Sequence, residues 1–138
     1  GEIDWQPWSA DAIAQAQAAG KPVLVDFTAT WCGPCIEIEK TAIDVPEVRQ
    51  KLASTGVVVL KADFTDKDPV ILKEMQRFGR AGPPLVLVYP SGVGSQPIVM
   101  PKVFTSAYML QKLDQAAGKK AANNEGLEPA DMAATSSN

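Results

Sequence analysis

The chain has 138 residues, of which 46% are hydrophobic, enough for a single domain with one core. Its 13 basic and 16 acidic residues give a net charge of −3, so the charge does not favour binding to nucleic acid or to an anionic membrane surface. The longest apolar runs are only strand-sized, and we expect no membrane insertion by this segment. The chain opens Gly1-Glu2-Ile3 without an initiator methionine or a secretory leader, which is typical of a mature or excised fragment and says little about location.

The first half of the chain predicts a helix, a buried strand and a second helix. Ser9 is a favourable N-cap, and Gly20 ends the helix that follows it. Residues 22–27 form a mostly apolar run that begins with a proline, which predicts a buried strand. The second helix should begin after Cys32 and restart after a kink at Pro46. The apolar positions expected inside these helices are Ala10, Ile13, Ala14, Ala18, Ile36, Ile38, Ala42 and Ile43.

The second half predicts three further strands and two helices. The expected segments are strands at 56–63, 84–89 and 97–100, a helix capped by Asp68 that ends at Phe78, and a helix from Thr105 with Tyr108, Leu110 and Leu113 facing inward. Helices between strands predict parallel pairing, and the short Ser91-Gly92 turn predicts one antiparallel hairpin. The predicted fold class is therefore α/β, with a central mixed sheet of about four strands and helices on both faces. This domain should cover residues 1–117, and the small polar residues of 118–138 predict a disordered tail.

Cys32 and Cys35 are the only cysteines of the chain, and they form the C-x-x-C of the run TATWCGPCIEIEK. A structural zinc site needs four ligands, and two thiolates in a chain without histidine are too few. A disulfide between them closes a very small ring, so it would remove little entropy from the unfolded chain. Redox chemistry is the remaining interpretation, and it requires no metal and no cofactor beyond the cysteine pair itself.

A C-x-x-C at the start of a helix suits thiol–disulfide exchange. The free N–H groups and the dipole at the helix N-terminus stabilise a thiolate, so Cys32 is the expected nucleophile. Cys35 lies about one turn deeper and can resolve a mixed disulfide by intramolecular attack, while Cys32 should be the more exposed of the two. Gly33 and Pro34 allow the close approach of a partner and fix the first helical turn.

The run VLVDFTATWCGPC resembles the active-site strand and helix of the thioredoxin superfamily, and a Gly-x-Pro follows some fifty residues later. The resemblance implies a thioredoxin fold in which Pro84 is in the cis form and faces the disulfide. Trp31 either shields the disulfide, the interpretation we favour, or is a half-buried core aromatic. Asp26 is either a strand-end carboxylate or, as its match to the family's strand acid implies, a proton acceptor near the cysteines.

A narrower resemblance, over roughly residues 21–113, is to the C-terminal domain of the DsbD/ScsB family of bacterial inner-membrane thiol:disulfide interchange proteins. It rests on Lys-Pro-Val-Leu-Val-Asp-Phe-Thr-Ala-x-Trp-Cys, Glu-x-Glu-Lys, Leu-Lys-Ala-Asp-x-Thr and Arg-Phe-Gly-Arg-x-Gly-x-Pro. It implies a monomeric reductase domain on the periplasmic side of the membrane, which takes electrons from a membrane-embedded domain and passes them to a periplasmic acceptor. It also implies that Asp26 and Glu39 lie near the cysteines, where negative charge raises the pKa of Cys32 and favours electron donation.

Two departures and two alternatives accompany this interpretation. Pro83 precedes the expected cis-proline and has no N–H, so one hydrogen bond of a strand-addition complex is impossible, although its carbonyl can accept. Thr28 replaces a tryptophan of general thioredoxins, which favours the DsbD-like interpretation. Lys61 either contacts the buried acid or extends to solvent. The alternatives are a free-standing thioredoxin-like reductant, general or for cytochrome maturation, and a non-catalytic binding module with a structural disulfide.

Overall fold

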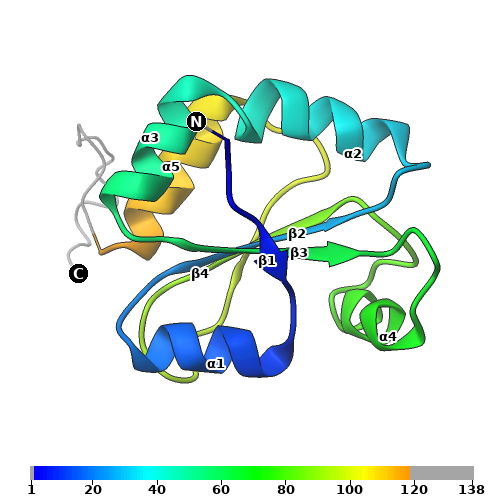
Figure 1. The fold of residues 1–138 in the computed structure, drawn as a ribbon, viewed down its shortest axis with the longest axis horizontal. Helices are drawn as coiled ribbons and strands as arrows, with labels where there is room; N and C mark the ends of the chain where they lie inside the picture. The colour runs from blue at the N-terminus through cyan, green and yellow to red at the C-terminus, as the bar shows by residue number, and fades with distance from the viewer. Residues whose placement is uncertain (1, 119–138) are drawn as a thin grey trace.

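A mixed five-stranded sheet lies between two layers of helices in the computed structural model, which describes residues 2–118 (Figure 1). The elements in chain order are β1 (Gln6–Pro7), α1 (Ala10–Ala18), β2 (Val23–Thr28), α2 (Gly33–Ile38), a π-helical turn (Glu39–Ile43), α3 (Pro46–Ser54), β3 (Val58–Asp63), α4 (Pro69–Arg77), β4 (Leu85–Tyr89), β5 (Ile98–Val99) and α5 (Ser106–Ala116). The predicted α/β thioredoxin-like fold is confirmed. The predicted tail lies outside the described residues, apart from Gly118.

The strands follow the order β1-β3-β2-β4-β5. β1, β3 and β2 run parallel, whereas β4 is antiparallel to β2 and β5 is antiparallel to β4. The hairpin of β4 and β5 is confirmed, but the expectation of parallel pairing is wrong for β4. The reason is the position of α4, which lies beside the end of the sheet where β3 finishes, so that β4 starts from that end (Figure 1).

The fifth strand, β1, is the element that the sequence did not predict. It has two exposed residues, one of them a proline, and therefore lacks the alternating or apolar pattern of a strand. It pairs with the edge of β3, with Gln6 opposite Leu60, and the Trp8 N–H donates to the Lys61 carbonyl over 2.9 Å. The prediction of about four strands thus missed this short edge strand.

The helices form two cores on opposite faces of the sheet. In Figure 1, α2, α3 and α5 lie on one face, and α1 and α4 lie on the other. Along β2, Val25 and Phe27 belong to the core under α1 and α4, whereas Leu24 belongs to the core under α2, α3 and α5. Because side chains alternate along a strand, Asp26 and Thr28 share the face of Leu24. The strand therefore directs its only acid toward the layer that contains α2.

The predicted caps Ser9 and Asp68 and the predicted helix start at Thr105 are confirmed, and some of the predicted inner faces are wrong. Ser9, Asp68 and Thr105 each accept a hydrogen bond from a backbone N–H in the first turn of their helix. In α1 the buried residues are Ile13, Ala16 and Gln17. The polar Gln17 is tolerated inside because its amide donates to the Pro90 and Ser95 carbonyls. The predicted inner residues that are exposed instead are Ala10, Ala14, Ala18 and Ile36, whereas Leu113 is buried and Tyr108 and Leu110 are half-buried. No helix of residues 2–118 is both long and apolar enough to span a bilayer.

Candidate active site

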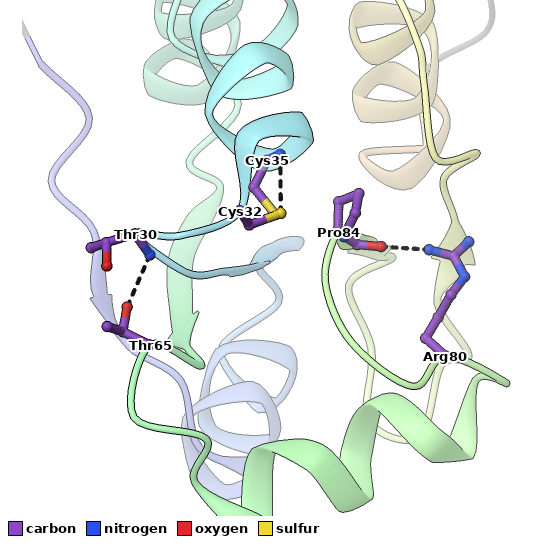
Figure 2. The surroundings of a disulfide bond; sticks show 6 residues. All are labelled: Thr30, Cys32, Cys35, Thr65, Arg80 and Pro84. Carbon is purple, nitrogen blue, oxygen red and sulfur yellow. Dashed lines mark hydrogen bonds between the residues drawn. A yellow bond between two sulfur atoms is a disulfide. The ribbon is translucent and has the colours of Figure 1, made fainter.

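Cys32 and Cys35 form a disulfide at the N-terminus of α2, with 5.3 Å between their Cα atoms. Cys32 is the N-cap residue, and Pro34 lies in the first turn, where its missing N–H breaks no hydrogen bond. The Cys35 N–H donates to Cys32 Sγ over 3.3 Å (Figure 2), and such a bond favours negative charge on that sulfur. Cys32 is 5% exposed and Cys35 is 2% exposed, so the predicted difference in exposure is small. Gly33 and Pro34 are exposed between them.

The segment that follows β3 holds the loop that leads into α2. The Thr30 N–H donates to Thr65 Oγ1 over 3.0 Å (Figure 2), and Trp31 Nε1 donates to the Thr65 carbonyl over 3.0 Å. The Asp63 carboxylate accepts from the Thr65 hydroxyl and N–H, and these hydrogen bonds lower the pKa of Asp63. Trp31 is 52% exposed, so it is not a core aromatic, and its shielding of the disulfide stays a prediction. Thr65 was not predicted as part of the site.

The Pro83–Pro84 peptide bond is cis, as the thioredoxin resemblance implies. Figure 2 shows Pro84 beside the disulfide, with its carbonyl directed away from the sulfurs toward Arg80, whose Nη1 donates to it over 2.7 Å. Neither proline has an N–H, so this turn can offer a partner only carbonyl oxygens. The Pro84 carbonyl is engaged by Arg80, and the Pro83 carbonyl is the acceptor that remains.

Asp26 is a buried acid in the middle of the sheet. It lies in β2 between Lys61 of β3 and Val86 of β4, and it is 2% exposed. Burial raises the pKa of Asp26 well above its ordinary value; a hydrogen bond with the Glu39 carboxyl and the charge of Glu39 raise it further, while the charge of Lys61 opposes them. Asp26 Oδ2 and Glu39 Oε2 are both buried, and neither has a hydrogen-bond partner among the described residues. Since two carboxyls can hydrogen-bond only when one carries a proton, this pair can hold a buried proton.

Glu39 reaches Asp26 because α2 continues past the second cysteine. Its N–H donates to the Cys35 carbonyl, so Glu39 lies one turn beyond Cys35, as the spacing predicted. It also begins the π-helical turn, in which the Asp44 N–H donates to the Glu39 carbonyl over 2.7 Å. Single π turns are frequent at functional sites.

A hollow of about 250 Å³ opens beside Glu39. It is lined by Thr28, Ala29, Thr30, Ile36, Glu39, Lys61 and Asp63. Thr28 and Ala29 are small, and Ile36 is 48% exposed at its edge, so the hollow gives the Glu39 carboxyl a route to solvent. Lys61 is half-buried at this wall, with Nζ 5.2 Å from the centre of the Trp5 ring. A larger hollow of about 530 Å³ between the N-terminal segment, α3 and β3 contains none of the predicted site residues.

The chemistry available at this site is that of sulfur and carboxyl groups. Within residues 2–118 no three Cys, Asp or Glu side chains are grouped so that they could hold a metal ion. A disulfide at a helix N-terminus, a neighbouring cis-proline and this strand order together define a protein of the thioredoxin class. A family model described as thioredoxin-like matches residues 4–91, and the chain belongs to this family.

The more specific similarity is to DsbD. The chain is 36% identical over 81 residues to the thiol:disulfide interchange protein DsbD 1 of Pseudomonas aeruginosa, which covers 59% of this chain and 13% of that protein. It is 40% identical over 87 residues to DsbD of Salmonella typhimurium, which covers 61% of this chain and 14% of that protein. The chain therefore spans only 13% to 14% of the length of these relatives.

Solved structures agree with this similarity. The oxidised C-terminal domain of DsbD from Neisseria meningitidis matches with a TM-score of 0.59 and 26% identity, over 81% of this chain and 98% of that domain. A thioredoxin from Thermus thermophilus matches with a TM-score of 0.66 and 23% identity, over 82% of this chain and 85% of that one, which shows the shared fold. The predicted resemblance to the C-terminal domain of DsbD is confirmed.

Proposed function

We propose that the chain is a thiol:disulfide oxidoreductase that works in the reductase direction, as the C-terminal domain of a DsbD-like interchange protein. The observation that carries the proposal is the Cys32–Cys35 pair at the start of α2, with the Cys35 N–H bonded to Cys32 Sγ. Cys32 is the N-cap of α2, and the free N–H groups and dipole at this helix N-terminus would stabilise a thiolate on its sulfur.

The reaction is two successive thiol–disulfide exchanges. The Cys32 thiolate attacks one sulfur of a partner's disulfide, the partner's S–S bond breaks, and its second sulfur leaves as a thiolate that takes up a proton. Cys35 then loses its proton and attacks Cys32 Sγ, which releases the partner's other thiol. The chain is oxidised to the disulfide, and the partner gains two electrons and two protons. The Asp26–Glu39 pair would take and return the proton of the cysteines as a general acid and base.

The direction of electron flow depends on the charge around Cys32. A buried carboxyl pair disfavours a second negative charge nearby, which raises the pKa of a thiol and makes the disulfide a poor oxidant. The WCGPC segment contains no basic residue, and the chain has no histidine, so no cation in that segment offsets the carboxyls. The helix N-terminus acts in the opposite sense, and we propose that the carboxyls have the larger effect.

The DsbD similarity supports a particular set of partners. The donor would be a membrane-embedded domain and the acceptor a periplasmic domain, both reacting through cysteines, with this domain on the periplasmic side of the bacterial inner membrane. We propose that the domain acts as a monomer. Trp31, Gly33, Pro34 and the Pro83–Pro84 turn would form the surface that meets these partners.

Reduction of a protein disulfide tests the proposal. Wild-type protein should accelerate the reduction of insulin by dithiothreitol, and Cys32→Ser should be no faster than dithiothreitol alone. If the wild type is equally inactive, the chain is not a disulfide reductase, and the binding-module alternative stands.

The direction is tested by titrating Cys32 through pH-dependent alkylation, with the modified cysteine identified by mass spectrometry. Asp26→Asn and Glu39→Gln should each lower the apparent pKa of Cys32, which belongs to the coupled group. Glu37→Gln is the matched control, since Glu37 is an exposed acid on the same helix and should leave the titration unchanged. A wild-type Cys32 that is already a thiolate at pH 5 would rule out the reductase direction argued here.

A further inference from the structure

Arg80 occupies a fixed position just after α4. Gly79 has a φ of +75°, and the N–H groups of Gly79 and Arg80 donate to the Gln76 and Met75 carbonyls, each over 3.0 Å. These two bonds form the helix-ending motif that glycine permits, in which the last carbonyls of the helix are satisfied by the chain that leaves it. The backbone of Arg80 is therefore anchored to α4.

The side chain of Arg80 reaches two backbone carbonyls on other segments. Nη1 donates to the Pro84 carbonyl over 2.7 Å, and Nη2 approaches the Met100 carbonyl at 3.4 Å. Met100 follows β5, and its own N–H donates to the Val86 carbonyl over 2.9 Å. Beyond it the chain continues into Pro101 and bends away, so the pairing of β4 with the β5 segment ends there. The guanidinium thus links the end of α4, the cis-proline turn and the connection between β5 and α5.

The charge of Arg80 is not used in an ion pair among the described residues. Arg49 and Arg77 each pair with a carboxylate, Asp44 and Glu74 respectively, whereas Arg80 is half-buried and bonds to carbonyls. A guanidinium carries several N–H donors in one rigid plane, so it can hold two carbonyls in a set geometry, which a single ammonium group does less well. The contacts of Arg80 are therefore those of a side chain that holds backbone segments in place.

The turn that Arg80 holds contains two consecutive prolines. Pro83 and Pro84 have no N–H, so this part of the turn cannot donate a backbone hydrogen bond to a neighbouring segment. The Arg80 contact comes from the side opposite the disulfide (Figure 2). It leaves the Pro83 carbonyl as the acceptor that can face a docking strand.

We propose that Arg80 is a positioning residue for partner docking: it holds the Pro83–Pro84 turn and the Met100 segment together so that the Pro83 carbonyl meets a partner's backbone N–H. The inference rests on the proposed reductase function and adds a residue outside the reacting groups. A protein disulfide, which must dock on this turn, depends on Arg80. A small disulfide, which reaches Cys32 without strand addition, does not.

The test compares one protein and one small uncharged substrate. Arg80→Met keeps the aliphatic stem, Arg80→Lys keeps the charge, and Arg77→Met is the matched control, since it removes a charge from the same helix end without touching the turn. With Arg80→Met, kcat/KM for insulin should fall about tenfold, mostly through KM, the size expected for one hydrogen bond from a charged donor. The rate with hydroxyethyl disulfide should change less than about twofold, because this substrate forms no strand-addition hydrogen bond with the turn. Arg80→Lys should recover part of the loss, and Arg77→Met should match the wild type.

A second measurement is independent of turnover. Amide hydrogen exchange should become faster at Met100 in Arg80→Met and stay unchanged in β2, while circular dichroism confirms that the fold is kept. Equal losses on both substrates, or unchanged insulin reduction with unchanged exchange at Met100, would overturn the Arg80 inference and leave the proposed function standing. A wild-type protein inactive on both disulfides would instead refute the proposed function, and the docking role with it.

Discussion

Replacing Asp26 by asparagine should stabilise the oxidised protein at neutral pH and leave its stability unchanged in acid. The substitution keeps the size of the side chain, and the new amide can still donate to the Glu39 carboxyl. It removes the possibility of a negative charge at a site that is 2% exposed. The predicted gain therefore comes from a charge that the folded wild type must bury and the unfolded chain need not.

The sign follows from the pKa of Asp26, which is raised in the folded state, first by burial and then by Glu39. Below the unfolded value of about 3.9, both states carry the proton, and the wild type has its full stability. As pH rises toward the folded pKa, the unfolded chain releases the proton first, and wild-type stability falls. One such group changes the free energy of unfolding by up to about 1.4 kcal/mol per pH unit in this window. Effective costs of buried charge suggest a plateau of about 1–4 kcal/mol in favour of Asp26→Asn at pH 8.

The assay is urea unfolding of the oxidised proteins from pH 3 to pH 9, so that the cysteines do not titrate. The difference between Asp26→Asn and wild type should start near zero, rise with pH and then level off. Asp63→Asn is the control of opposite sign, because the hydrogen bonds from Thr65 lower the pKa of Asp63. Its stabilising contribution is present at neutral pH and lost in acid, so this exposed substitution should cost at most about 1 kcal/mol above pH 5, and the cost should shrink as the pH falls toward 3. A difference for Asp26→Asn that stays flat with pH would refute the buried-proton argument.

Two further predictions concern the sulfurs and the turn. Cys35→Ser should trap mixed disulfides with partner proteins, visible as adducts on non-reducing gels, while Cys32→Ser should trap few; equal trapping by both would overturn the assignment of Cys32 as nucleophile. Pro83→Thr restores an N–H at the docking turn and should raise the rate of mixed-disulfide formation with protein substrates by up to roughly tenfold, the effect of one hydrogen bond of about 0.5–1.5 kcal/mol. Unchanged rates across several partner proteins would count against strand addition at this turn.

The parts of the fold that local chemistry determines were predictable from the sequence. Helix starts at Ser9, Asp68 and Thr105 depend on one side chain and its own backbone neighbours. The buried strands are short apolar runs, and the cis-proline follows from a motif shared with a known family. The spacing of Glu39 after Cys35 placed the acid one helical turn beyond the cysteine, because a helix fixes such distances.

The parts that depend on contacts between distant segments were not predictable in this way. β1 forms because its backbone pairs with the edge of β3, whereas its own two residues carry no strand pattern. The orientation of β4 depends on where α4 lies, which no local pattern encodes. Ile36 is apolar and helical, yet it lines the hollow beside Glu39 and is half exposed. In each case the deciding partner is far away in the sequence.

Distant contacts also explain why Thr65 and Arg80 were not predicted as residues that hold the candidate site in place. Thr65 holds the loop before α2 from 34 and 35 residues away, and Arg80 touches Met100 from 20 residues away. Neither has the signature of a reactive group: Thr65 is one of many polar residues after a strand, and Arg80 is one more cation at a helix end.

The residues of the candidate site divide into two groups that would act on different steps of the proposed reaction. In the proposed reductase, Asp26 and Glu39 would act on the proton and charge of the cysteines from the α2 side of the sheet, where burial strengthens the effect of a charge. Thr65 and Arg80 contact other residues of the site, and their hydrogen-bond partners there are Thr30, Trp31, Pro84 and Met100 rather than the sulfurs. Sites that share no partner have nearly independent effects on free energy. In the proposed reductase, the redox behaviour of the cysteines and the choice of docking partner can therefore change separately, the first through the carboxyl pair and the second through the residues that hold the loop and the turn.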